Sequence, residues 1–415
     1  MLKQITLNNW KSFGDAALYI DPLTVLIGTN ASGKSNVLDA LQLLNRMASG
    51  LGIKSVLDGD ANITGVRGGM EWACLDRAKC LSLSVVAGSA CEDNIEYHYQ
   101  IDIQLKDTQA TIVAESLQRI KYRARTRKNP GRIYLFRTDP ATDGDPHLVA
   151  RLYNGHQGTK ATLSNTTALL FQLSLQKNRS EIDEGIQQLI GDLQKVFILD
   201  PIPSHMRGYT PLAEQLEPDA ANIAGVLAAL DEAEQQRIEA TLKHYVQHLP
   251  EKDITRIYAE TVGKFARDAM LYCDEDWGDN NPHTIDARGM SDGTLRFLGV
   301  LVALLTRPEH SMLIVEEVDN GLHPSRSELL ITMLKELGAQ RSIDILVTTH
   351  NPTLLDTMGP AMVPFITVAH RNAATGQSEL TLLEEISELP KLLASGPVGR
   401  LSAQGRIERT LQGES

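Results

Sequence analysis

The sequence predicts an α/β protein with an antiparallel β subdomain and a helical lobe. Short apolar strands that stand before helical patterns, such as Leu23–Ile27, favour a sheet of parallel strands. From Cys80 to about Leu152, apolar and polar residues alternate in short runs broken by glycine and Asn-Pro, which is typical of an antiparallel sheet. Between about Thr166 and Phe265 the apolar residues follow a helical period, which indicates the helical lobe.

These patterns divide the chain into three consecutive parts. We expect an N-terminal lobe over residues 1–165, a helical lobe over 166–284 and a C-terminal lobe over 285–415. The acidic and polar stretch from Asp274 to Pro282 is expected to be a loop. After it, strands and helices alternate again to about Val368.

The composition fits a globular protein of the cytoplasm. Of the 415 residues, 42% are hydrophobic and 22% are charged, which is close to the globular average. The N-terminus has no apolar secretory segment, and the apolar run from Phe297 to Leu305 is too short to span a bilayer. We therefore expect no contact with a membrane. The net charge of −12 argues against a protein that coats nucleic acid by bulk attraction. The four cysteines form no Cys-x-x-Cys pair, so neither a zinc site nor a redox motif is predicted.

A phosphate-binding loop is predicted between the strand Leu23–Ile27 and a helix over about Lys34–Met47. Its sequence, Gly-Thr-Asn-Ala-Ser-Gly-Lys-Ser, fits the pattern G-x-x-x-x-G-K-[ST] in full. The glycines let backbone N–H groups close around a phosphate, while the lysine and the helix N-terminus neutralise its charge. The serine after the lysine is expected to bind Mg²⁺. The predicted nucleotide-binding residues here are Gly28, Asn30, Ala31, Ser32, Gly33, Lys34, Ser35 and Asn36.

Two carboxylates follow the apolar strand Met312–Val315. Since side chains alternate along a strand, two successive acids at its end can serve different tasks. We expect Glu316 to hold the Mg²⁺ shell through water and Glu317 to orient the attacking water. Without a phosphate loop in the same chain, two solvated acids after a core strand would be the simpler interpretation.

Two further motifs follow the same logic. Ser291 and Gly293 precede the apolar helix Leu295–Leu305, so they can form an anion site at its N-terminus, although alone they would be an ordinary helix cap. His350 ends the short apolar strand Ile345–Thr349 and could donate a hydrogen bond to a γ-phosphate. A histidine considered by itself is more often structural.

The order of these motifs resembles the head of an ABC-type ATPase. The phosphate loop comes first, followed by Ser-Asp-Gly-Thr, the acidic strand with Asp-Asn-Gly-Leu-His-Pro behind it, and Thr-Thr-His. The opening segment Asn9–Phe13 and the phosphate loop are similar to those of RecF, SMC and OLD proteins. The chain also resembles stand-alone AAA-family ATPases that accompany anti-phage and toxin-like effectors. The resemblance covers roughly residues 1–50 and 285–370.

This resemblance implies an ABC-type P-loop head that binds ATP and Mg²⁺ and hydrolyses ATP, with Glu317 and His350 as catalytic residues. In such heads the signature motif of one protomer closes over the ATP held by another, so a dimer or larger homo-oligomer is implied. Two features depart from the pattern. Asp292 stands where the transporter-type signature has glycine, and Gln172 and Gln176 are weak candidates for a Q-loop glutamine.

The resemblance also suggests a cytosolic switch in DNA repair or anti-phage defence that acts on DNA or on a separate effector. The 65 residues after His350 are too few for the appended TOPRIM nuclease of OLD proteins, so an effector such as a nuclease is expected to be another polypeptide.

Two other classes share part of this pattern. The ATPase subunit of a membrane transporter resembles this chain, but such subunits have a much shorter interval between phosphate loop and signature than the one between Ser35 and Ser291. A P-loop kinase or GTPase would share only the loop, and no Asn-Lys-x-Asp guanine motif is present.

A basic stretch supplies a candidate nucleic-acid contact. Alternation along a strand would place five cations on one face, where they could meet nucleic acid or an acidic partner. An edge strand charged to resist aggregation is the alternative. The five residues are Arg119, Lys121, Arg123, Arg125 and Arg127.

Overall fold

The computed structural model describes residues 1–75, 80–106, 108–122, 130–142, 144–249, 254–278, 282–386 and 388–412. The chain forms two compact units, and each is built from separate segments. Unit 1 contains residues 1–21, 28–196 and 367–381; unit 2 contains residues 22–27, 197–366 and 382–415. The division therefore differs from the three consecutive lobes expected from the sequence, because strands from the chain ends pair with strands far away in sequence.

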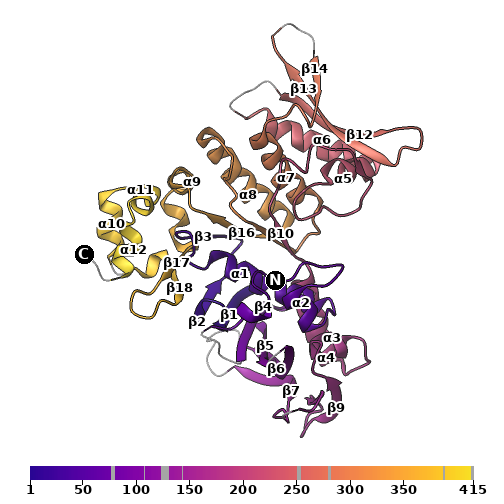
Figure 1. The fold of residues 1–415 in the computed structure, drawn as a ribbon, viewed down its shortest axis with the longest axis vertical. Helices are drawn as coiled ribbons and strands as arrows, with labels where there is room; N and C mark the ends of the chain where they lie inside the picture. The colour runs from indigo at the N-terminus through magenta and orange to yellow at the C-terminus, as the bar shows by residue number, and fades with distance from the viewer. Residues whose placement is uncertain are drawn as a thin grey trace. The chain divides into compact units, whose positions relative to one another are not determined.

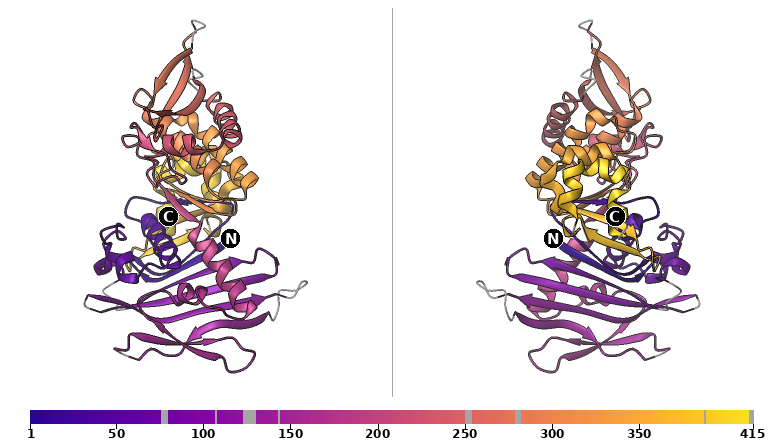
Figure 2. Two further views of the ribbon diagram at one scale, coloured as in Figure 1. Left: turned by 90° about the vertical axis from the view of Figure 1, so that its right-hand side faces the viewer. Right: turned by 90° about the vertical axis from the view of Figure 1, so that its left-hand side faces the viewer.

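Unit 1 is built around a long sheet in which β4 to β9 follow one another as antiparallel neighbours (Figures 1 and 2). The strand order is β17-β18-β2-β1-β4-β5-β6-β7-β8-β9. The antiparallel sheet predicted between Cys80 and Leu152 is thus confirmed. The strands are β1 (Leu2–Trp10), β2 (Phe13–Tyr19), β4 (Cys80–Gly88), β5 (Ile95–Lys106), β6 (Gln109–Lys121), β7 (Gly131–Thr138), β8 (His147–Leu152), β9 (Thr159–Ser164), β17 (Ile366–Arg371) and β18 (Ser378–Leu382).

Helices cover one face of this sheet. Alternate residues of β5 are buried, as the alternation in the sequence requires, and among them Tyr97 donates a hydrogen bond to Glu184 of α4. A Cβ on Gly185 of α4 would overlap Leu135 of β7, so a glycine allows the helix to approach the sheet closely. The helices of unit 1 are α1 (Lys34–Ala48), α2 (Ile53–Asp58), the 3-10 turn η1 (Met70–Trp72), α3 (Leu169–Ser174) and α4 (Ser180–Gln194).

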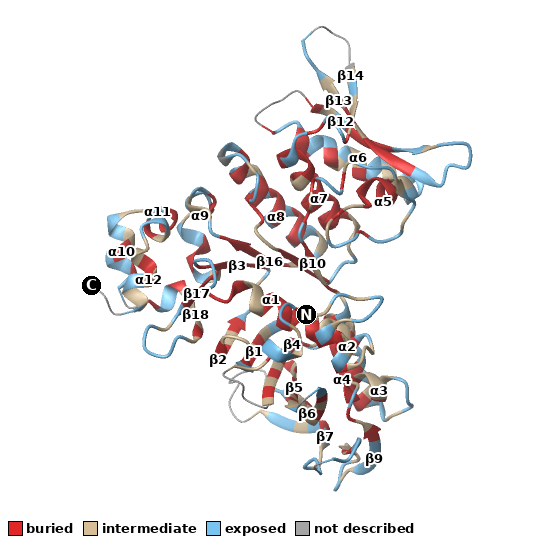
Figure 3. Cartoon of the chain, in the orientation of Figure 1, coloured by how far each residue is buried: buried red, intermediate tan, exposed pale blue. Residues whose placement is uncertain are grey.

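Unit 2 contains short strands in the order β10-β15-β16-β3, of which the last three are parallel. The strands β15 and β3 are buried along their whole length, and β16 is buried after its first residue (Figure 3). Burial on both faces explains why these strands read as continuous apolar runs. They are β3 (Leu23–Ile27), β10 (Val196–Leu199), β15 (Met312–Val315) and β16 (Asp344–Thr349).

The helices of unit 2 include α7, whose residues after its first turn are almost all buried. The helical elements are α5 (Ile223–Ala229), α6 (Glu232–Val246), α7 (Asp292–Thr306), η3 (Pro324–Arg326), α8 (Ser327–Arg341), α9 (Pro352–Met358), η4 (Pro360–Phe365), η5 (Leu383–Glu385), α10 (Leu389–Ser395), α11 (Val398–Ala403) and α12 (Arg406–Leu411). Among the described residues, none of the helices is both long and apolar enough to cross a bilayer.

A second, smaller sheet belongs to unit 2 and corrects the secondary-structure prediction. It consists of β11 (Thr210–Pro211), β12 (Ile254–Val262), β13 (Asp268–Asp276) and β14 (Pro282–Asp286). The prediction of helix up to Phe265 and of a loop from Asp274 was therefore wrong in this region. Isoleucines at 254 and 257 fit a helical period as well as a strand, and pairing with β13 along the length of β12 decides the conformation.

Candidate functional site

The phosphate loop runs from Gly28 to the first residues of α1, as predicted. Ala31 has φ of 64° and Gly33 has φ of 111°, so the backbone turns through left-handed conformations of the kind that aim successive N–H groups into one concavity. A Cβ on Gly33 would lie 2.8 Å from both Phe13 Cζ and Ser378 Oγ. Glycine is therefore required at this position by conformation and by space.

Lys34 and Ser32 supply polar atoms inside this loop. Lys34 is buried, and its Nζ donates hydrogen bonds to the carbonyl oxygens of Gly28 at 2.6 Å and Thr29 at 3.1 Å. Ser32 is 1% exposed, and its Oγ has no hydrogen-bond partner among the residues that the structure describes. A buried ammonium, an orphaned hydroxyl and the uncapped first turn of α1 fit an anion with several oxygens, such as the phosphates of a nucleotide.

Residues from both ends of the chain support the start of α1. Trp10 is fully buried and donates its indole N–H to the carbonyl oxygen of Asn36 at 2.7 Å. The Asn36 amide donates to Ser12 Oγ at 2.8 Å, and Ser378 Oγ donates to the same hydroxyl at 2.8 Å. Asn36, which we predicted to bind nucleotide, is thus also a structural link. Within the loop itself, the carbonyl oxygen of Ala31 accepts a hydrogen bond from Arg371 Nε at 3.1 Å.

Lys11, next to Trp10, binds Asp39 of α1. Its ammonium donates to the Asp39 carboxylate and to the carbonyl oxygen of Arg67. Arg67 Nε donates to the other carboxylate oxygen at 3.1 Å. Burial lowers the pKa of Lys11, and the bond to Asp39 opposes that shift. This cluster fixes the opening motif against α1.

The predicted acids lie at the turn after β15 in unit 2. Val315 is the register partner of Val347 in β16. The backbone N–H of Glu317 donates to Thr348 Oγ1 at 2.8 Å, and that of Glu316 donates to the carbonyl oxygen of Leu199 at 3.1 Å. Bonds from both flanking strands therefore fix the position of the two acids.

The backbone at Glu317 is unusual, with φ of 48°. Left-handed backbone is uncommon for residues other than glycine and is found more often at functional sites. The Glu317 carboxylate accepts a hydrogen bond from Asn320 Nδ2 at 3.3 Å. Two residues further on, Asp319 is buried, and its Oδ1 has no hydrogen-bond partner in the described part of the chain. The segment therefore offers carboxylate oxygens that can accept further bonds.

His350 follows the end of β16 and is exposed. The preceding residue, Thr349, pairs in register with Ile27, the last residue of β3. Asn351 caps α9 with its side chain, which accepts the Thr353 N–H at 2.9 Å. The strand end and the helix cap together fix the backbone around His350.

The signature-like motif forms the N-terminus of α7. Ser291 is the N-cap, and its Oγ accepts the Thr294 N–H at 3.1 Å. A Cβ on Gly293 would lie 2.9 Å from the carbonyl oxygen of Gly321, and Arg326 Nη2 donates to Thr294 Oγ1 at 3.3 Å. Unit 2 thus brings the signature and the segment behind the acids into contact.

The candidate Q-loop glutamines gain little support. Gln172 uses its side-chain amide within its own turn, because Oε1 accepts the Ser164 N–H and Nε2 donates to the carbonyl oxygens of Ser164 and Thr167. Gln176 is exposed just after α3. The sequence signal was weak at both positions, and Gln172 has a local structural role.

The basic stretch is only partly described, since Arg123, Arg125 and Arg127 lie outside the described residues. Lys121 Nζ is 2.6 Å from Glu92 Oε2. Arg119 is the register partner of Tyr97, so it lies on the sheet face that α4 covers. Because β6 lies between β5 and β7, the edge-strand alternative does not fit this part of the stretch.

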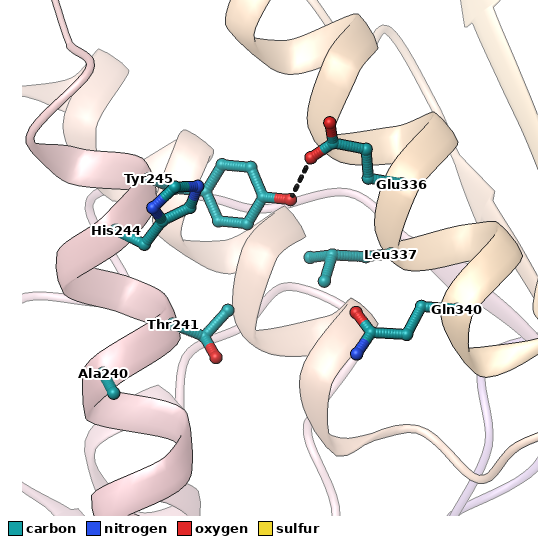
Figure 4. A pocket seen from close by; sticks show the side chains of 7 residues that line it. All are labelled: Ala240, Thr241, His244, Tyr245, Glu336, Leu337 and Gln340. Carbon is teal, nitrogen blue, oxygen red and sulfur yellow. Dashed lines mark hydrogen bonds between the residues drawn. The ribbon is translucent and has the colours of Figure 1, made fainter.

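A pocket of about 360 Å³ between α6 and α8 contains none of the predicted site residues (Figure 4). The Tyr245 hydroxyl donates to Glu336 across it at 3.0 Å, and burial raises the pKa of Tyr245 to about 12.

Two family models match the chain. Residues 1–197 match a model described as "AAA ATPase domain", and residues 274–356 match one described as "AAA domain, putative AbiEii toxin, Type IV TA system". No curated protein matches the chain.

One solved SMC head has a similar fold, and two further SMC heads match the chain at TM-scores below 0.5. The crystal structure of the SmcHead bound to the C-winged helix domain of ScpA is 13% identical, with 92% of this chain and 97% of that chain covered at a TM-score of 0.51. The SMC head domain from Thermotoga maritima is 14% identical, with 92% and 98% covered and a TM-score of 0.44. The Smc head domain with an extended coiled coil, bound to the C-terminal domain of ScpA derived from Pyrococcus furiosus, is 12% identical, with 95% and 99% covered and a TM-score of 0.47.

The phosphate loop, the family matches and the SMC-head fold define the chain as a P-loop ATPase with an ABC-type head. The two matches to AAA ATPase domains support an enzyme that hydrolyses ATP.

Proposed function

We propose that this ATPase is a cytosolic switch in which two or more copies share ATP sites. Ser291 and Asp292 are exposed, whereas the helix that they begin is buried almost throughout. The N-terminus of α7 therefore begins at the surface of unit 2, where Ser291 and Asp292 are accessible to another molecule. This single observation carries the proposal, because a signature motif acts on the γ-phosphate bound by a neighbouring protomer.

In the proposed reaction, the phosphate loop and Lys34 bind the nucleotide phosphates. Glu317 accepts a proton from the attacking water, and His350 donates a hydrogen bond to the γ-phosphate. Because Glu317 and His350 act on charge that develops during phosphoryl transfer, they lower the barrier rather than strengthen the binding of ATP in the ground state.

Mg²⁺ fits the donor set. The hydroxyl of Ser35 and the carboxylate of Glu316 are oxygen ligands of the kind that this ion prefers. In the described part of the chain no three acidic, histidine or cysteine side chains gather as a metal site, which suits an ion held partly by substrate phosphates. When bound, Mg²⁺ would neutralise charge on the transferring phosphoryl group.

The process that the switch serves is proposed to be DNA repair or anti-phage defence. The match of residues 274–356 to a model whose description names a toxin system supports the defence role. The SMC head in the solved structure is bound to a second protein, ScpA, which supports control of a separate effector, such as a nuclease, through protein contact. Alternatively, the proposed switch acts by binding DNA directly rather than by controlling an effector protein.

The ATPase subunit of a membrane transporter remains the alternative, and it is disfavoured. Between the phosphate loop and the signature this chain inserts both the antiparallel strands β4 to β9 and the small sheet. Neither is needed for a compact transporter motor.

The test combines ATP hydrolysis with assembly. Glu317→Gln keeps the size of the side chain and removes the base, so phosphate release should fall roughly 10²–10⁴-fold while ATP still binds. The protein should then accumulate as an ATP-dependent dimer or larger assembly in light scattering with ATP and Mg²⁺. Lys34→Ala should lose nucleotide binding, and Ser291→Arg should bind ATP but not assemble.

Glu328→Gln is the matched control, because Glu328 is an exposed acid in the first turn of α8. It should hydrolyse and assemble like the wild type. Wild-type hydrolysis by Glu317→Gln would remove Glu317 from the mechanism and make Glu316 the next candidate. ATP-dependent assembly by Ser291→Arg would contradict the shared site.

A further inference from the structure

Arg207 holds the segment that leads into the signature helix. It lies between β10 and β11, 85 residues before Asp292 in the sequence. Its Nη1 lies within hydrogen-bond distance of three carbonyl oxygens, those of Ala287 at 2.9 Å, Arg288 at 3.0 Å and Met290 at 2.8 Å. Its Nη2 donates to Asp292 Oδ1 at 2.5 Å. One guanidinium therefore contacts four of the six residues from 287 to 292.

Residues 287–291 of this segment belong to no strand or helix. The segment begins where β14 ends, the Ala287 N–H donates to the carbonyl oxygen of Leu271 in β13 at 2.9 Å, and the Met290 N–H donates to the carbonyl oxygen of Ala287 in a turn. Carbonyl oxygens that turn inward need donors, and the planar guanidinium offers several in a rigid array. Charged donors also form stronger hydrogen bonds than neutral ones. Arg207 is therefore the main side-chain support of the residues immediately before Ser291.

The contact between Arg207 and Asp292 gives a reason for an aspartate at position 292, where transporter-type signatures have glycine. The side chain of Asp292 is 70% exposed and that of Arg207 is 27% exposed, so the ion pair alone contributes little stability. Its geometric effect is larger, since it ties the first residue of α7 to the same group that holds the carbonyl oxygens. Asp292 thus has a role in this chain that a glycine could not fill.

A second arginine supports the other side of the motif. Arg326 is buried and donates to Thr294, and its guanidinium lies against Gly293. The residues next to Ser291 and Gly293 in the sequence are therefore held by two guanidinium groups. Their backbone is constrained on both sides before any nucleotide arrives.

We infer that Arg207 is a positioning residue for ATP hydrolysis, which sets the N-terminus of α7 so that Ser291 and Gly293 can meet the γ-phosphate of a neighbouring protomer. This inference rests on the shared ATP site proposed above. Arg207 touches no nucleotide in this scheme and acts only through the signature. Misplacement of a site by about 1 Å can cost roughly 100-fold in rate, so a lost clamp should matter at saturating ATP.

The experiment uses Arg207→Ala and Arg207→Lys in the full chain. Affinity for a fluorescent ATP analogue, kcat and KM for ATP, and ATP-dependent light scattering are measured for each. Arg207→Ala should keep nucleotide affinity within about twofold, lose roughly 10–100-fold in kcat and lose assembly with ATP. Arg207→Lys, which retains the cation and some of the donors, should recover part of kcat. Arg256→Ala is the control, since it removes an arginine pair with Glu239 at 2.9 Å in the same unit but away from the signature.

The outcomes separate this inference from the proposed function. Wild-type kcat and assembly in Arg207→Ala, with Glu317→Gln still inactive and Ser291→Arg still unable to assemble, would overturn the clamp and leave the shared site standing. Assembly by Ser291→Arg would instead remove the shared site. If Arg207→Ala does not fold, Arg207→Lys and Asp292→Ala are compared instead. A lower kcat in either variant would support the clamp. An unchanged kcat in both variants would overturn it.

Discussion

A buried carboxylate in unit 1 makes the stability of the protein depend on pH. Glu115 of β6 is fully buried, and its oxygens accept the N–H groups of Leu169 and Leu170 at 2.7 Å each, at the start of α3. The Tyr99 hydroxyl donates to the same carboxylate at 3.0 Å. Burial raises the pKa of Glu115 from 4.5 to about 7, against the effect of these three hydrogen bonds.

The sign of the effect follows from proton binding. Between pH 4.5 and about 7 the folded protein holds a proton on Glu115 that the unfolded chain releases, so the free energy of unfolding falls as pH rises through this window. Each pKa unit corresponds to about 1.4 kcal/mol, so the whole window amounts to about 3 kcal/mol. Below pH 4.5 and above about pH 7, the ionisation of Glu115 no longer makes the free energy of unfolding depend on pH.

The assay is urea unfolding followed by circular dichroism at pH 5, 6, 7 and 8. The glutamine of Glu115→Gln cannot ionise. The free energy of unfolding of this variant, relative to that of the wild type, should therefore rise by about 3 kcal/mol between pH 5 and pH 8. Glu92→Gln serves as the control, because it makes the same change from acid to amide in a half-exposed pair with Lys121 at the surface. Equal pH dependence in the wild type and in Glu115→Gln would refute the reasoning.

Two further predictions concern the phosphate loop. Gly33→Ala should weaken ATP binding by about tenfold, because the left-handed backbone and the contact with Phe13 together cost about 1–3 kcal/mol. Titration with a fluorescent ATP analogue measures this loss. The control Gly191→Ala, in the last turn of α4 where a Cβ meets nothing within 4 Å, should bind ATP normally. Trp10→Phe should lower the free energy of unfolding by about 1–3 kcal/mol, since the buried indole hydrogen bond to the carbonyl oxygen of Asn36 and part of the ring packing are lost, and an unchanged melting temperature would contradict this role.

Local features of the fold could be predicted from the sequence. The phosphate loop is contiguous, and the conformations of its glycines are dictated by residues next to them, so its position and the helix over Lys34–Met47 were confirmed. The antiparallel strands were predictable because one covered face imposes alternation, as in β5. The helix after Ser291 was confirmed for a similar reason, since a serine cap and an apolar run are local signals.

Features that depend on distant pairing could not be predicted. Arg371 bonds to the phosphate loop and Ser378 bonds to Ser12 beside it, each across more than 300 residues, and nothing in their own surroundings marks them. Arg207 is a single arginine in a loop, and only the fold reveals its contact with Asp292. The strand β12 was missed because its apolar spacing suits a helix equally well until β13 pairs with it.

The support of the phosphate loop by β17 and β18 has a consequence for protein synthesis. The loop is translated near the beginning of the chain, but Arg371 and Ser378 emerge from the ribosome only after more than 330 further residues. Until then, the complete G-x-x-x-x-G-K-[ST] sequence is present without the hairpin that packs against Gly28 and Gly33. The nascent chain thus contains the motif long before the strands that support it, so competence to bind ATP is delayed until β17 and β18 have been translated.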